Sequence, residues 1–196
     1  MTLTELIAEV YTLTGRPDQV AETSVAIRKA TLKMHSLDFF YRDLQEKIIQ
    51  FPTTSYKQQY DLGVNLSSYR ALKYVRQWNV VPTGKERYLE SIEPDAIMDS
   101  YGKEATNIWY VAGSNLNIKC SELISNLVIG YYKHPDIATS TYSSWIAIEQ
   151  PFAIIEEACA MIFQSIGHAE MARKFEALSA QNMALLRQNY LEAQAR

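Results

Sequence analysis

The sequence has few of the residues on which dedicated chemistry depends. Its 196 residues include two cysteines and three histidines. Cys120 and Cys159 lie far apart in dissimilar contexts, so neither a disulfide framework nor a metal site is expected. The histidines fall at the ends of predicted elements, without partners at metal-ligand or triad spacing. The sequence therefore predicts no metal, no cofactor and no catalytic residues, and we do not expect an enzyme.

Phosphate-binding glycine motifs are also missing. Gly84-Lys85 lacks the upstream glycine and the following hydroxyl of a P-loop, and no GxGxxG follows a predicted strand. Glu156-Glu157 is the nearest approach to a pair of catalytic carboxylates, but adjacent helical positions point about 100° apart. We expect both side chains to lie on a solvent-exposed strip of their helix.

Two further features are absent, namely a strongly positive charge and a long hydrophobic run. The formal net charge is -3, whereas dedicated nucleic-acid binders are usually basic. No run of about 18 uncharged apolar residues occurs, and Glu5 would interrupt the apolar core of a signal peptide. We expect a soluble protein of a reducing compartment that has no membrane partner.

One segment is nevertheless locally basic. Residues 42–87 carry eight Lys or Arg against four Asp or Glu. Single-stranded nucleic acid binds to surfaces that combine such cations with aromatic rings, although tyrosine and tryptophan are equally typical of protein interfaces and half-buried strands. Interface or strand packing is favoured because the net charge is negative, and nucleic-acid binding through strands 69–87 remains the alternative function. The residues concerned are Tyr69, Arg70, Lys73, Tyr74, Arg76, Trp78 and Arg87.

Hydrophobic periodicity predicts helices at both ends of the chain and strands in the middle. From Leu44 the period of apolar residues changes from 3.6 to 2. Pro52-Thr53-Thr54 predicts a hairpin turn, and Gly113-Ser114-Asn115 predicts a second one. The expected helices are residues 2–14, 18–37, 95–101, 145–167 and 168–193, and the expected strands are 44–51, 55–62, 70–81, 107–112, 116–120 and 126–132.

This order of elements predicts an α+β fold. A helical bundle is expected from residues 1–41 and 145–196, with an antiparallel β-sheet module, residues 42–134, inserted into it. We treat residues 1–196 as a single domain, because a chain of this length can bury its own core.

The two C-terminal helices differ in character. Apolar residues cover about 200° of the helix at 145–167, which is wider than the stripe of a surface helix and predicts burial on most sides. The helix at 168–193 would be about 39 Å long and is much less apolar. We expect its end to extend past the core, so that Leu186, Tyr190 and Leu191 have little of their own protein to cover them and form a candidate docking element.

Several segments together resemble a known family. They are YVAGSNLNIK in the sheet module, a strand that ends in YYKHP, the helix YSSWIA…P…AIIEEACAMIFQSIG and the long helix HAEMARKFEALSAQNMALLRQNYL. In this order, behind two short N-terminal helices, they resemble the head-to-tail adaptor (connector, or head-completion) proteins of tailed bacteriophages. The resemblance covers nearly the whole chain.

The resemblance implies a structural virion protein. About a dozen copies would form a ring, a dodecamer, beneath the portal and extend the DNA channel toward the tail. The partners implied are other copies of the chain, the portal protein and tail or nozzle proteins, with DNA passing through the lumen without specific binding. The implied location is the head-to-tail interface of the virion, and the host cytoplasm during assembly.

The resemblance also implies roles for individual residues. Met183, Leu186, Tyr190 and Leu191 on the C-terminal helix would dock on the portal. Lateral contacts would pair the tyrosine-rich sheet module of one copy with the helices of the next. The loop tips would contact the tail or a neighbouring copy, through Val81, Pro82, Thr83, Gly84, Gly113, Ser114 and Asn115.

Overall fold

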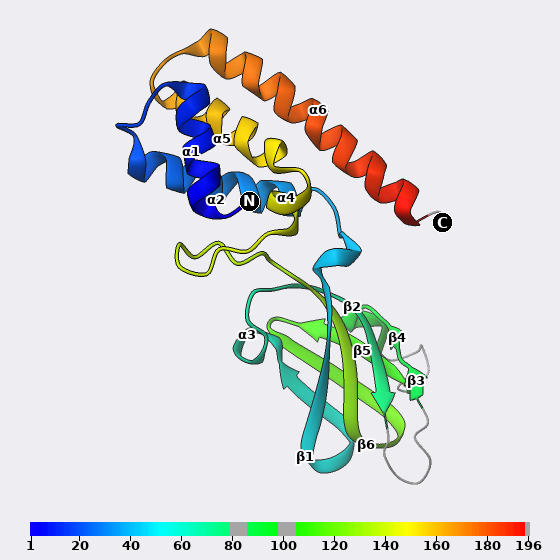
Figure 1. The fold of residues 1–196 in the computed structure, drawn as a ribbon. Helices are drawn as coiled ribbons and strands as arrows, with labels where there is room; N and C mark the ends of the chain where they lie inside the picture. Colours follow the sequence, from blue (N-terminus) through cyan, green and yellow to red (C-terminus); the bar gives the residue numbers. More distant parts are fainter. Residues whose placement is uncertain (79–85, 98–104, 195–196) are drawn as a thin grey trace. The chain divides into compact units, whose positions relative to one another are not determined.

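The computed structural model describes residues 1–78, 86–97 and 105–194, with side chains through residue 190. It has an α+β fold, as the sequence predicts (Figure 1). The chain divides into two compact units, which are a helical unit, Met1–Arg42 with His134–Arg196, and a sheet unit, Asp43–Lys133. The segment that leads from the last strand back to the helices belongs to the helical unit, where Asp136 and Ser143 form an isolated bridge.

The helical unit begins with a capped helix. The Thr2 hydroxyl accepts a hydrogen bond from the Glu5 N–H at 3.3 Å, and the Glu5 carboxylate accepts one from the Thr2 N–H at 2.7 Å. This capping box satisfies two backbone donors that the first turn leaves without partners. The helices of the unit are α1 (Leu3–Thr14), α2 (Val20–Ser36), α4 (Trp145–Glu149), α5 (Pro151–Ser165) and α6 (Ala169–Gln194).

The expectation of one continuous helix over residues 145–167 is wrong. Two helices, α4 and α5, meet at Gln150, whose backbone leaves the helical region with φ -137° and ψ 61°. The proline ring of residue 151 disfavours a helical conformation in the residue before it. Pro151 therefore starts a new helix at a position where its missing N–H costs nothing.

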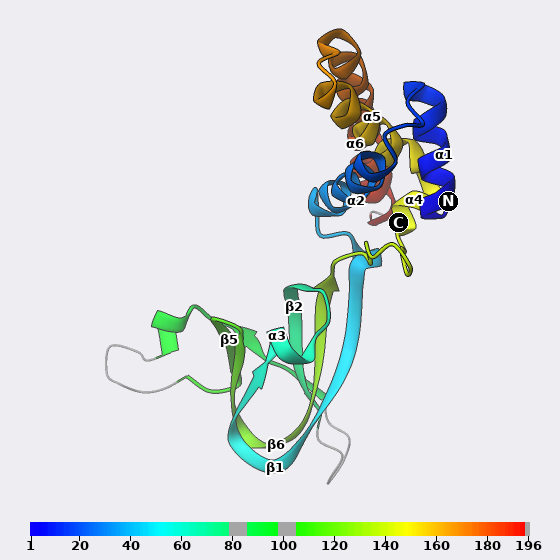
Figure 2. The same cartoon turned by 90° about the vertical axis from the view of Figure 1, so that its left-hand side faces the viewer.

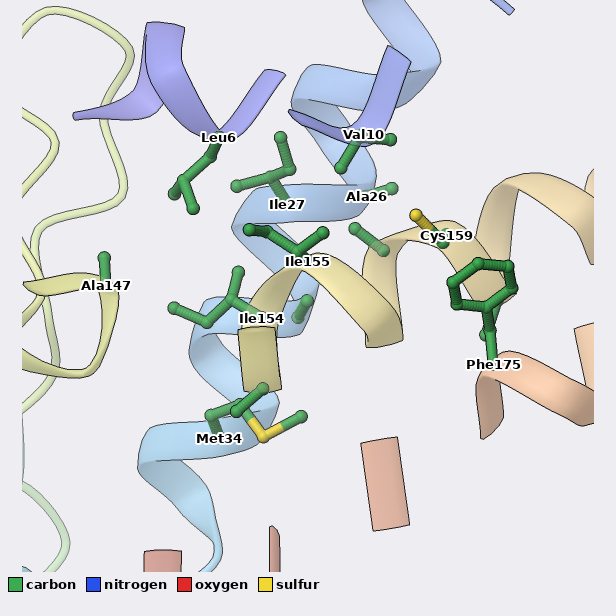
Figure 3. Close-up of a cluster of buried hydrophobic side chains, with 14 of the residues drawn as sticks. Leu6, Val10, Ala26, Ile27, Met34, Ala147, Ile154, Ile155, Cys159 and Phe175 are labelled. Carbon is green, nitrogen blue, oxygen red and sulfur yellow. The ribbon is translucent and has the colours of Figure 1, made fainter. Parts of the chain in front are cut away.

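Helix α5 lies at the centre of the helical unit. It packs against α1, α2 and α6, and Figure 3 shows Ile154 and Ile155 among side chains from the neighbouring helices. Ala153 and Ala160 interrupt its polar strip, and both are buried. The largest fully buried side chains of this core are Leu6, Ile27, Met34, Phe40, Ile146, Ile154 and Ile155.

The sheet unit is built around one long strand, β6. Strand β1 pairs with one edge of β6 over most of its length, while β2 and β5 pair with different parts of the other edge. All pairs are antiparallel except β4 with β5. The strands are β1 (Leu44–Asp61), β2 (Tyr69–Trp78), β3 (Glu86–Tyr88), β4 (Glu90–Ser91), β5 (Ile108–Ala112) and β6 (Asn115–Lys133).

The hairpin expected at Pro52-Thr53-Thr54 is wrong, because these residues lie within the single strand β1. Both halves of β1 pair with the same partner, and the register shifts between Gln50 and Ser55 and again before Lys57. Such an irregularity bends a strand without ending it. The strands expected at 116–120 and 126–132 are likewise one strand, β6. Of the short helix expected at 95–101, a 3-10 turn covers Pro94–Ile97, and residues 98–101 lie outside the described part.

The bend in β1 and β6 folds the sheet onto itself, as Figure 2 shows. We call residues 44–50 of β1, the C-terminal half of β6, β2 and β3 the first limb, and residues 57–61 of β1, the N-terminal part of β6, β5 and β4 the second limb. One core cluster joins the inner faces of both limbs. It includes Ile49, Val75, Leu127 and Ile129 from the first and Trp109, Leu116 and Ile118 from the second.

Candidate functional site

The end of helix α6 is the site that the sequence analysis assigns to docking. The expectation that little of the protein covers Leu186 is wrong, since this side chain is 3% exposed and belongs to the core of the helical unit. Met183 and Tyr190 are partly buried against the same core. The side chain of Leu191 lies outside the described part of the chain. Among the large apolar side chains described at the end of α6, Leu185 is the exposed one, at 52%.

Tyr190 is held in place from both sides. Its hydroxyl donates a hydrogen bond to the Phe39 carbonyl at 3.0 Å and accepts one from the Tyr41 N–H at 3.0 Å. The Tyr190 ring stacks on Tyr41 at 5.5 Å between centroids and meets Phe40 edge-on at 4.9 Å. This arrangement ties the end of α6 to the segment that follows α2.

A pocket of about 120 Å³ opens beside Tyr190. Arg42 forms an ion pair with Glu149 there, and its guanidinium lies 5.5 Å from the centre of the Trp145 ring. Guanidinium groups over aromatic faces and exposed aromatic rings are typical of protein interfaces. We call this site the aromatic pocket, and its lining residues are Tyr41, Arg42, Trp145, Glu149, Gln150, Leu186, Asn189 and Tyr190.

Exposed apolar side chains accompany the aromatic pocket. Tyr41 in its lining is 47% exposed, and Leu185, adjacent in sequence to Leu186 of the lining, is 52% exposed. Ile148 on α4 and Phe152 on α5 are 71% and 55% exposed. A combination of a hollow, aromatic rings and exposed apolar side chains can bury apolar surface against a protein partner.

The loop tips assigned to tail or neighbour contacts are only partly described. Val81, Pro82, Thr83 and Gly84 lie outside the described residues. The second tip is the turn between β5 and β6, where Gly113 adopts a left-handed conformation with φ +63° that favours glycine. The Ser114 carbonyl accepts a hydrogen bond of 2.8 Å from the Leu62 N–H, and Asn115 is the first residue of β6. Gly113 and Ser114 are exposed.

The basic strands of the alternative function have much of their charge neutralised within the sheet unit. Arg76 donates hydrogen bonds of 2.6 Å to both Glu46 and Glu86. Arg87 lies 3.5 Å from the Glu122 carboxylate and also donates to Asn107 and Ser121. Guanidinium groups that already bind carboxylates attract phosphates less, so the carboxylates beside Arg76 and Arg87 weaken the attraction of this surface for nucleic acid.

The expectation of a solvated strip at Glu156-Glu157 is wrong for Glu157, which is 6% exposed. Its carboxylate lies 2.6 Å from the Lys33 ammonium of α2 and accepts a 2.8 Å hydrogen bond from the Ser179 hydroxyl of α6. The neighbouring Glu156 accepts a hydrogen bond from Asn182, and burial raises the pKa of its carboxyl group. In the sequence, these contacts are indicated only by the polar residues Ser179 and Asn182 on the otherwise apolar side of α6.

A histidine and a serine far apart in the sequence, His35 and Ser144, also meet. The His35 Nε2 atom lies 2.9 Å from the Ser144 hydroxyl, which caps α4 by accepting a hydrogen bond from the Ala147 N–H. His35 is 1% exposed and Ser144 5%. The contact links α2 to the start of α4 inside the helical unit.

No family model matches the chain, and no curated protein matches it either.

Among the described helices, none is both long and apolar enough to cross a membrane. Within residues 1–78, 86–97 and 105–190, no three His, Cys, Asp or Glu side chains converge in a way that could hold a metal ion.

Proposed function

We propose that the protein is a head-to-tail adaptor of a tailed bacteriophage, a structural subunit of a ring that joins the portal to the tail and extends the DNA channel. The proposal starts from the resemblance of nearly the whole chain to that family. The single observation that supports it most is the aromatic pocket at the end of α6, whose lining includes the exposed ring of Tyr41. That is where a docking surface is expected from the resemblance.

Docking would involve residues different from those that the sequence alone selects. Leu186 stabilises the helical unit from inside, whereas Leu185 and Tyr41 offer apolar surface to a partner. Met183, Tyr190 and Leu191 remain in the proposal, Tyr190 as the ring that shapes the pocket. A portal segment with apolar side chains that covers Leu185 and Tyr41 would remove their apolar surface from water, and the Arg42–Glu149 pair at the rim would orient it.

The ring would leave DNA unbound as it passes. A net charge of -3 on each chain and arginines that already bind carboxylates disfavour a tight grip on phosphates. The proposed partners are therefore the portal, tail or nozzle proteins and further copies of the chain, and no reaction is assigned to the protein.

The test is native mass measurement of the protein mixed with portal rings from the same virus. We expect a fixed number of copies, about a dozen, to add to each portal. Truncation of α6 would not test this, because Met183 and Leu186 belong to the core. The sharper variant is Leu185→Asp, which places a charge on the proposed docking surface and should reduce binding at least about tenfold.

The matched control is Leu123→Asp in the sheet unit, where the leucine is 46% exposed. This change should leave portal binding intact. If wild-type protein adds to no portal at any salt concentration, the adaptor proposal fails. Salt-dependent binding to a labelled single-stranded oligonucleotide would then favour the nucleic-acid alternative.

A further inference from the structure

Strand β1 lies at an edge of the sheet. It pairs with β6 on one side, and none of the described strands pairs with its other side. An unpaired strand edge presents N–H and C=O groups to which a strand of another chain can bind. We call this side of β1 the outer edge.

The register shows which backbone groups of the first limb point to the outer edge. The Leu89 N–H donates to the Val75 carbonyl at 3.0 Å, so Val75 faces β3 and the next residue, Arg76, faces β6. Arg76 is paired with Val128 of β6, which is paired with Ile48 on its other side. Because each residue of an antiparallel strand bonds to only one of its two neighbours, Val128 bonds to β2. Ile48 therefore directs its N–H and C=O groups to the outer edge.

Glu46 and Gln50 follow the same alternation, so their backbone groups also point outward. Among the described residues, none forms a hydrogen bond with these outward groups. The side chain of Ile48 is 51% exposed. Lysine often protects a strand edge, but the Lys47 ammonium donates to the Asn65 carbonyl at 2.8 Å. The outer edge is therefore open to pairing along the first limb.

The second half of β1 is less open. It begins after Pro52, which has no N–H to donate to a partner strand. The Lys57 N–H donates to the Ser55 hydroxyl at 3.2 Å, and the Asp61 carbonyl accepts a 2.8 Å hydrogen bond from the Asn65 side chain. Nearby side chains thus satisfy part of this edge, and the open segment ends before Pro52.

We propose that the outer edge of the first limb pairs with the same edge of a second copy of this chain, antiparallel, with a two-fold axis at Ile48. In this register Ile48 lies opposite Ile48, and Glu46 lies opposite Gln50. Both are hydrogen-bonded pairs, because these are the residues with outward groups, and each pair exchanges two bonds. The exposed isoleucines cover each other, and no like charges lie directly opposite.

The neighbouring two-fold registers are all less favourable. An axis at Glu46 places two carboxylates opposite each other, and an axis at Lys47 does the same with two ammonium groups, which destabilises a strand pair. An axis at Ile49 or Gln50 places Pro52 in a hydrogen-bonded position, where its missing N–H breaks the ladder. Charge, proline position and exposure thus select the same register of self-pairing, and this agreement is the reason for choosing a second copy as the occupant.

The contact goes beyond the proposed function and does not depend on it. A two-fold contact uses the same surface on both copies and stops at two, so it is not the repeating contact of a ring. It belongs to the free protein before assembly. There it would prevent an open strand edge from pairing with other chains.

Cysteine variants test the contact and its register. Hydrogen-bonded residues in antiparallel strands have Cα atoms about 5.5 Å apart, which suits a disulfide, so Ile48→Cys should form a covalent dimer on mild oxidation. Gln50→Cys is the matched control, because its two copies would be about 14 Å apart along the strands. Cys120 and Cys159 are buried and add no background. No link at Ile48→Cys, or an equal or stronger link at Gln50→Cys, overturns the proposal.

Sedimentation gives an independent measure. We expect the wild-type protein to form dimers, and Ile48→Lys, which places two ammonium groups opposite each other, to raise their dissociation constant by about tenfold or more. Tyr56→Lys is the control, since Tyr56 lies on the same strand beyond Pro52 and is 55% exposed. It should leave the dissociation constant unchanged. Equal melting temperatures establish that both variants are folded.

Three results separate this contact from the alternatives. A wild-type protein that stays monomeric, or a dimer that Ile48→Lys does not weaken, overturns the proposal. If the wild type is monomeric and Ile48→Lys abolishes portal binding, the outer edge belongs to the portal contact. Failure of portal binding by a protein that still dimerises through Ile48 would refute the adaptor function alone.

Discussion

The ring of Tyr74 lies across Gly130, with its nearest atoms 2.4 Å from the position that a Cβ on residue 130 would occupy. The two residues are directly paired between β2 and β6. The Tyr74 hydroxyl donates a hydrogen bond to Glu46, and burial, with that hydrogen bond, raises the pKa of Tyr74 to about 12. Tyr74 therefore remains a neutral donor at physiological pH, and only glycine at position 130 lets it lie there.

Gly130→Ala should destabilise the sheet unit. The added methyl group would displace the Tyr74 ring from its contacts with Glu46 and Arg76, and we expect the free energy of unfolding to fall by about 1–3 kcal/mol. Urea denaturation measures this change. In a Tyr74→Ala background the same substitution should cost clearly less, because the obstructing ring is gone.

Gly63→Ala is the matched control for this prediction. A Cβ at Gly63 would meet its nearest atoms at 3.5 and 3.6 Å, which is ordinary van der Waals contact. We expect its unfolding free energy to stay within about 1 kcal/mol of wild type. Equal costs of Gly130→Ala with and without the Tyr74 ring would show that the ring is not the obstacle.

Lys33→Met should destabilise the helical unit, because it removes the cation that pairs with the buried carboxylate of Glu157. Only 7% of the Glu157 side chain is exposed, whereas 47% of the Lys33 side chain is, so solvent screens part of the interaction. We expect the free energy of unfolding to fall by about 1–3 kcal/mol, less than for a fully buried pair. Lys29→Met, one turn earlier on the same helix, should change it by less than about 0.5 kcal/mol. Chemical denaturation of both variants at pH 7 decides the comparison.

Leu186→Ala and Leu185→Ala separate the core of the helical unit from its surface. Leu186 is 3% exposed, and truncating it should cost about 2–5 kcal/mol of unfolding free energy. Leu185 is 52% exposed and should cost less than about 0.5 kcal/mol. Thermal or urea unfolding measures both, and a small effect at Leu186 would mean that this side chain is available for docking after all.

The two cysteine thiols should resist labelling in the folded protein. Burial raises the pKa of the Cys120 thiol to about 11 and that of Cys159 to about 12, so both stay protonated at pH 8. A thiolate is the reactive species, and both side chains are also covered. We expect almost no reaction with a disulfide reagent at pH 8 and release of two equivalents in guanidinium chloride. Rapid labelling of either native thiol would contradict the burial assigned to it.

Much of the fold could be predicted because its signals are local. The Gly113 turn depends on neighbouring residues, and the segment Gly113-Ser114-Asn115 predicts it. The change of period at Leu44 similarly marks the start of the sheet. The turn expected at Pro52 failed because a proline beside threonines suits a hairpin and a bent edge strand alike. Because both halves of β1 pair with β6, the structure has the bent edge strand and not the hairpin.

The candidate site was less predictable, because exposure depends on distant partners. Leu185 and Leu186 are adjacent apolar residues, and the sequence does not show which of them the core covers. Glu157 and Ser179 are both polar residues that look solvent-facing in sequence, and they meet only when α5 and α6 pack together. The pocket around Tyr190 likewise combines residues from three separate segments of the chain.

The sequence by itself determined the order of helical and strand segments, the turn at Gly113-Ser114-Asn115 and the α+β class, since backbone preference and hydrophobic period act over a few residues. Only the tertiary structure decided that β1 and β6 each run as one bent strand, that Glu157 is buried and that Leu186 belongs to the core. These outcomes depend on which surfaces are buried against one another away from water. The residues that form those surfaces are far apart in the chain.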